Sequence, residues 1–117
     1  MADLTKKAYT KTQFSNAQLL EFSKCMNDPT HFLDNYFTIQ HPTKGSMIYG
    51  AYDYQKDLID SYHNYRFSIS MLGRQMGKST TAAGYLLWYA MFNPDQTILI
   101  AAHKYSGAQE IMHRIRY

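Results

Sequence analysis

The chain has 117 residues, of which 45% are hydrophobic, and a formal net charge of +3 at pH 7. This length suits one modest domain at most, and the hydrophobic fraction excludes a chain that is disordered throughout. A single cysteine, Cys25, excludes an internal disulfide and favours a reducing, cytosolic setting, while the small positive charge permits an anionic partner without requiring one.

Short helices are expected in the first part of the chain. Residues 1–14 are polar and predict a flexible arm, and they lack the apolar core of a signal peptide. Ser15 and Gln18 match a capping box, so a helix should begin there. The Asn27-Asp28-Pro29 sequence should end that helix and start a second, short one that carries Phe32, Leu33, Tyr36 and Phe37 on its apolar face.

A turn and a third helix follow. Residues 41–45, with a proline and a glycine, predict a turn, and residues 47–52 can be extended. Residues 53–62 predict a helix with Leu58, Ile59 and Tyr62 on one side. We assign residues 15–62 to a helical lead-in.

The last part of the chain predicts a strand at 67–72, a helix at 79–92, a strand at 97–102 and a helix at 106–116. The helix at 79–92 is apolar almost all round, and its stretch 82–92 is shorter than the roughly 20 residues that a membrane span needs. Ser106, with Gln109 three residues later, predicts the cap of the last helix, with Ile111, Met112 and Ile115 facing inward. The order predicts an α/β fold, a parallel sheet flanked by helices, over residues 63–117.

Between the first predicted strand and its helix lies a possible phosphate-binding loop, G-R-Q-M-G-K-S-T (73–80). The first amides of a helix can bind a phosphate, and Gly77 allows close backbone approach. Lys78 can reach the β- and γ-phosphates, Ser79 can ligate Mg²⁺, and Thr80 would lie near the α-phosphate. The usual pattern is G-x-x-x-x-G-K-S/T, but Leu72 stands where its first glycine belongs.

Residues 73–80 resemble the deviant phosphate-binding loop of tailed-phage terminase large subunits, the ATP-driven motors that package viral DNA. That family has a small residue, Arg, Gln, an apolar residue and then Gly-Lys-Ser/Thr. The resemblance runs from about Asp28 to the end of the chain, and the stretch A-Y-D-Y-Q-K-D-L-I-D (51–60) resembles the family's adenine-recognition element.

The resemblance implies the N-terminal part of a P-loop ATPase domain that uses ATP and Mg²⁺. It implies Arg74 and Lys78 as catalytic residues, Arg74 as an arginine finger acting in cis, and Ser79 as a Mg²⁺ ligand. A carboxamide such as that of Gln55 suits adenine, since it can both donate and accept. The implied nucleotide-binding residues are Tyr54, Gln55, Gly73, Arg74, Gln75, Met76, Gly77, Lys78, Ser79 and Thr80.

The family also implies double-stranded viral DNA, a portal and a small terminase subunit as partners. It implies a ring oligomer in the motor and a location in the host cytoplasm. Two alternatives stay open: a fragment of another P-loop DNA translocase or helicase, and a truncated chain that binds nucleotide without turnover.

Hydrolysis in this class also needs an apolar strand that ends in an Asp for Mg²⁺, followed by a Glu that activates water. None of the nine acidic residues ends such a strand. The resemblance places the missing strand between 67–72 and 97–102, which would leave both segments unpaired. We therefore expect the 117-residue chain to be poorly stable and to hydrolyse little or no ATP.

Overall fold

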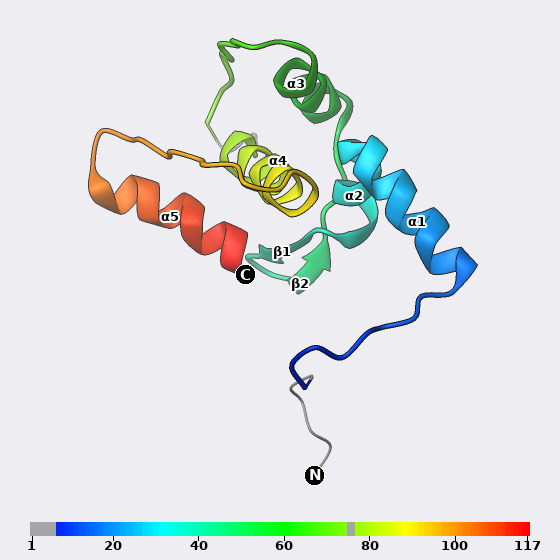
Figure 1. Ribbon diagram of the computed structural model, residues 1–117. Coiled ribbons are helices and arrows are strands. Elements are labelled where there is room, and N and C mark those ends of the chain that lie inside the picture. Colours follow the sequence, from blue (N-terminus) through cyan, green and yellow to red (C-terminus); the bar gives the residue numbers. More distant parts are fainter. Residues whose placement is uncertain (1–6, 75–76) are drawn as a thin grey trace.

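The computed structural model describes residues 7–74 and 77–117 (Figure 1). These residues form five α-helices and one antiparallel sheet of two strands. The helices are α1 (Asn16–Asn27), α2 (Pro29–Tyr36), α3 (Asp53–Asn64), α4 (Lys78–Phe92) and α5 (Tyr105–Arg116). The strands are β1 (Thr38–His41) and β2 (Gly45–Ile48).

The predicted α/β fold, a parallel sheet flanked by helices as in a P-loop NTPase, is wrong. Neither 67–72 nor 97–102 forms a strand, and the described residues contain only the antiparallel β1–β2 pair. The side chains of Phe67, Ile69 and Leu99 are 81%, 96% and 89% exposed, so these segments are not buried either. A strand requires a neighbouring strand for its backbone hydrogen bonds, and an apolar sequence does not supply one.

The predicted starts of the first two helices are confirmed. The Ser15 N–H donates to Gln18 Oε1 at 2.9 Å, and the Gln18 N–H donates to Ser15 Oγ at 3.3 Å, which completes the capping box of α1. At the start of α2, Asp28 Oδ1 accepts from the Thr30 N–H at 3.0 Å, and Pro29 occupies the first turn. These contacts span only two or three residues, which is why the sequence revealed them.

The hairpin was predicted only in part, and two predictions about α5 are wrong. The turn at 41–45 connects β1 to β2, whose register pairs Thr38 with Ile48 and His41 with Gly45; β1 was not predicted, and β2 ends at Ile48 within the segment 47–52. The predicted cap Ser106 is wrong, since α5 begins at Tyr105 and no side chain caps it. Met112, expected to face inward, is 40% exposed.

Helix α4 lies at the centre of the packing, against α2, α3 and α5 (Figure 1). Its Trp88 donates from Nε1 to the carbonyl oxygen of Cys25 at 2.7 Å, which ties α4 to α1. The buried cluster comprises Cys25, Phe32, Leu33, Phe37, Tyr49, Ile59 and Trp88. Within residues 7–74 and 77–117, no helix has the length and apolarity required to cross a membrane.

We predict that Gly84→Ala destabilises the fold by about 1 kcal/mol. A Cβ at Gly84 would lie 2.5 Å from Leu33 Cδ2 and 2.9 Å from Phe37 Cε1. Leu33 is fully buried, so it cannot move aside freely. Overpacking costs about 1–3 kcal/mol, which exceeds the helix-propensity gain of about 1 kcal/mol for Gly→Ala. The free energy of unfolding in urea measures the difference.

The control is Ala90→Gly, at an exposed position of the same helix. It should cost about 1 kcal/mol through helix propensity alone. A Gly84→Ala variant that is more stable than the parent chain would show that α2 and α4 do not pack this closely.

Candidate functional site

The first turn of α4 has the geometry of an anion-binding helix terminus. Gly77 precedes the helix with φ 75°, in the left-handed region that favours glycine. The first intrahelical bond joins the Thr81 N–H to the Gly77 carbonyl oxygen at 2.8 Å. The amides of Lys78, Ser79 and Thr80 therefore have no acceptor within the helix. Such amides can bind a phosphate directly.

A buried hydrogen-bond chain fixes this turn in place. The Thr81 hydroxyl donates to the Gly77 carbonyl oxygen at 2.8 Å and lies 2.6 Å from the Tyr49 hydroxyl. Since Thr81 uses its proton on Gly77, Tyr49 is the donor to Thr81. Burial raises the pKa of the Tyr49 phenol, which keeps it a neutral donor. The start of α4 is thereby attached to the residue that follows β2.

Gln55, predicted to recognise adenine, lies against Gly77. Its side chain is 5% exposed, and its Oε1 accepts from the Tyr52 N–H at 3.0 Å. A Cβ built on Gly77 would lie only 2.6 Å from Nε2 of Gln55. The fold therefore brings together two parts of the predicted site that are far apart in the sequence, and Gly77 is required for their close contact.

An aromatic pair lies at the start of α3, beside Gln55 in the sequence. The rings of Tyr52 and Tyr54 are stacked, with centroids 5.9 Å apart and planes 12° apart. Tyr54 is half-buried, whereas Tyr52 is 68% exposed. The sequence singled out Tyr54 only. Tyr52 was missed because an alternating pair of tyrosines at a helix start has no distinguishing pattern.

In the described part of the loop and in the first turn of α4, the charged side chains are all positive. Lys78 is the first residue of the helix and is exposed, as are Gly73 and Arg74. The first turn of α4 contains no acidic residue. Gln75 and Met76, the remaining predicted loop residues, lie outside the described residues.

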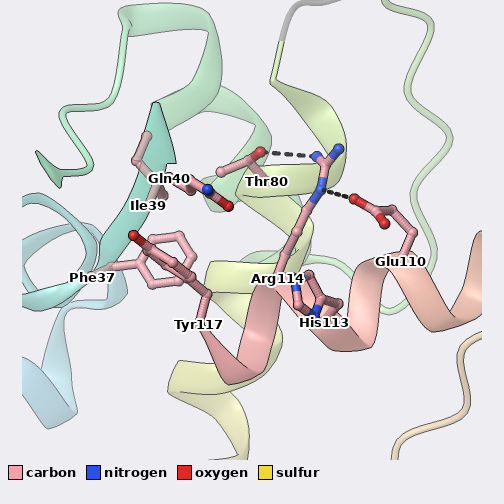
Figure 2. A pocket seen from close by; sticks show the side chains of 8 residues that line it. All are labelled: Phe37, Ile39, Gln40, Thr80, Glu110, His113, Arg114 and Tyr117. Atoms are coloured by element: carbon pink, nitrogen blue, oxygen red, sulfur yellow. Dashed lines mark hydrogen bonds and ion pairs between the residues drawn. The ribbon is translucent and has the colours of Figure 1, made fainter. Parts of the chain in front are cut away.

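A further arginine, for which the sequence predicted no role at this site, contacts the same turn (Figure 2). Arg114 reaches from α5 and donates from Nη1 to Thr80 Oγ1 at 3.1 Å, while its Nε lies 3.5 Å from Glu110 Oε1. Ser79 and Thr80 are half-buried. Arg114 and Thr80 border a cavity of about 230 Å³, whose other lining residues are Phe37, Ile39, Gln40, Glu110, His113 and Tyr117. In the sequence Arg114 belongs only to the basic end of the chain, and nothing there indicated a contact with Thr80.

We predict that Gly77→Ala costs more stability in the parent chain than in a Gln55→Ala background. Alanine in the left-handed conformation costs roughly 1–2 kcal/mol in both backgrounds. In the parent chain the new Cβ must also displace the Gln55 carboxamide, which is buried. Urea unfolding of the parent chain, the two single variants and the double variant gives the coupling energy between the two positions.

Equal costs of Gly77→Ala in the two backgrounds would mean that Gln55 does not pack on the loop. Gly45→Ala is a matched control, because Gly45 also has a positive φ, 71°, but has no atom within 4 Å of a built Cβ. It should report the backbone cost alone.

A search of the chain against protein-family models found no match.

Proposed function

We propose that residues 73–80 bind the phosphates of ATP together with Mg²⁺, and that the chain is the nucleotide-binding part of a viral DNA-packaging motor of the terminase class. The observation that carries the proposal is the placement of Lys78 at the first position of α4, after a left-handed Gly77 and without an acidic residue in the turn.

This arrangement is unfavourable unless an anion is present. The N-terminus of a helix carries about half a positive charge, and a cation there costs roughly 0.3–1 kcal/mol. Arg74 adds a second positive charge in the preceding loop, whereas the Arg114 charge at Thr80 is paired with Glu110 at 3.5 Å. A triphosphate would supply the negative charge that Lys78 and Arg74 lack. Local rules that a sequence breaks without structural compensation often mark functional sites.

The residues present fit a magnesium nucleotide. The free amides and the Lys78 ammonium suit the β- and γ-phosphates, and the Ser79 hydroxyl is a hard oxygen ligand of the kind that Mg²⁺ prefers. When bound, Mg²⁺ neutralises charge on the phosphate oxygens. Arg74, exposed in the loop, is placed by the proposal at the γ-phosphate, where a guanidinium stabilises negative charge.

The base would lie on the α3 side of the loop. Gln55 adjoins Gly77, and the Tyr52–Tyr54 pair offers an aromatic surface at the same helix start. The terminase resemblance implies Tyr54 and Gln55 as adenine contacts. Because Gln55 is 5% exposed and its Oε1 accepts from the Tyr52 N–H, its side chain would have to turn out of this position to reach the base. Phosphate binding would use the loop and the first amides of α4, whereas the described residues contain no parallel sheet of the kind that a P-loop ATPase has.

The motor assignment comes from the resemblance of residues 73–80 and 51–60. It brings double-stranded DNA, a portal and a small terminase subunit as proposed partners, in a ring oligomer in the host cytoplasm. Turnover needs a carboxylate for Mg²⁺ and one to activate water, and no acidic residue of the sequence stands in such a place. For the 117-residue chain we therefore propose nucleotide binding with little hydrolysis.

We predict that Lys78→Ala weakens binding of a fluorescent ATP analogue by about tenfold to a hundredfold. A hydrogen bond to a charged group contributes about 1.5–3 kcal/mol, and each 1.4 kcal/mol is a factor of ten. Lys44→Ala, which removes an exposed lysine from the β1–β2 turn, should leave the affinity unchanged. Fluorescence titration in the presence of Mg²⁺ measures both.

Equal affinity of the Lys78→Ala and parent chains for the analogue would refute the proposed loop. In the intact protein, the same variant should stop ATP-driven translocation of DNA. Undiminished translocation would refute the motor assignment even if nucleotide binding were confirmed.

A further inference from the structure

A cluster of metal-binding side chains lies at the junction of α1 and α2, away from the residues of the proposed nucleotide site. Glu21 and Cys25 are one turn apart on α1, and His31 is on α2. One donor atom from each, a carboxylate oxygen, the thiol sulfur and a ring nitrogen, all lie within 4.8 Å of one another. His31 Nε2 is 2.7 Å from Glu21 Oε1, and Cys25 is 5% exposed.

We propose that Glu21, Cys25 and His31 form a Zn²⁺ site that joins α1 to α2. Thiolate, imidazole and carboxylate are the ligand types that zinc takes, and Mg²⁺ does not favour this set. Zinc–ligand bonds of about 2.0–2.3 Å place tetrahedral donors roughly 3.3–3.7 Å apart. The three donor atoms lie within 4.8 Å of one another, so small side-chain movements are enough to bring them around an ion.

Neighbouring side chains hold the three proposed ligands in place. The Tyr36 hydroxyl donates to Glu21 Oε1 at 2.8 Å, which orients the carboxylate. Asn35 Nδ2 donates to the His31 carbonyl oxygen at 2.8 Å and lies 3.3 Å from His31 Nδ1, so it holds the side of the ring that faces away from Glu21. Trp88 holds the backbone of Cys25 through its carbonyl oxygen. Metal-bound histidine and carboxylate ligands normally have such outer partners.

The ion would have a path to the site and room for a water ligand. An open cavity of about 500 Å³ touches Glu21, Cys25 and Tyr36 from one side, and a second one of about 390 Å³ touches His31. Three protein ligands leave the fourth tetrahedral position for water. On binding, the Cys25 thiol releases its proton, and the imidazole binds as the neutral ring through Nε2, so that its proton resides on Nδ1.

Co²⁺ is the probe for the test, because it takes the zinc geometry and absorbs visible light. The full chain, freed of metal by a chelator and without nucleotide, is titrated with Co²⁺. We expect one equivalent to bind with tetrahedral visible bands and a sulfur-to-cobalt charge-transfer band, and both should vanish when Zn²⁺ is added. Zn²⁺ should also raise the melting temperature of the chain.

Two variants test the ligands Cys25 and His31, and a third is the control. Cys25→Ser should lose the charge-transfer band and the Zn²⁺-dependent rise in melting temperature. His31→Gln, which keeps a donor for Glu21, should weaken Co²⁺ affinity at least tenfold, because even the loss of a residue that only orients a ligand costs about that much. His103→Gln, at an exposed position before α5, is the matched control and should leave both signals unchanged.

Absence of the bands at one equivalent of Co²⁺ would overturn the proposal, and Glu21 and His31 would then be an ordinary hydrogen-bonded pair beside a buried thiol. Bands that persist in Cys25→Ser would overturn it as well. If Cys25→Ser does not fold, as judged by its circular dichroism, the affinity of His31→Gln decides. None of these outcomes depends on nucleotide binding, so the two proposals are tested separately.

Discussion

The buried hydrogen-bond chain from Tyr49 through Thr81 to Gly77 is the contact on which the arrangement of α4 depends. It fixes the start of the helix against the end of the hairpin, and Thr81 has no exposed surface through which water could replace it. An unsatisfied hydroxyl in such a place costs about 1–3 kcal/mol, so the chain favours a single position of the turn. Gly84 and Trp88 extend the same helix into the core.

Both proposed sites depend on α4: one lies at its N-terminus, and the other lies near Trp88, further along the helix. At the N-terminus, the turn presents free amides beside Lys78, and Arg114 of α5 reaches Thr80. Further along, Trp88 is hydrogen-bonded to the Cys25 backbone, next to the Glu21–Cys25–His31 cluster. A rigid α4 would therefore place the first site and support the second. One central helix can serve both sites because its N-terminus and its Trp88 side chain contact different parts of the chain.

The exposed apolar segments contrast with this well-packed region. Residues 67–72 and 97–102 flank α4 in the sequence, yet Phe67, Ile69 and Leu99 project apolar surface to solvent. Exposed apolar surface of this kind removes the free-energy gain that burial would give, at roughly 25 cal/mol per Å². The expected low stability of the 117-residue chain has its physical basis there, while α1–α4 and the hairpin share the buried cluster.

The sequence by itself determined the features that depend on neighbouring residues: the capping box of Ser15 and Gln18, the helix start at Asp28 and Pro29, the turn at 41–45, and the five helices. The residues of the loop 73–80, on which the nucleotide proposal is based, were also visible there. Only the tertiary structure decided the sheet, the contact of Gln55 with Gly77, the bond from Arg114 to Thr80, and the gathering of Glu21, Cys25 and His31. Capping and turn formation involve atoms a few residues apart, whose chemistry a short stretch of sequence specifies. Strand pairing and side-chain contacts between distant segments depend on which surfaces meet, and the apolar pattern of 67–72 and 97–102 could not specify a partner.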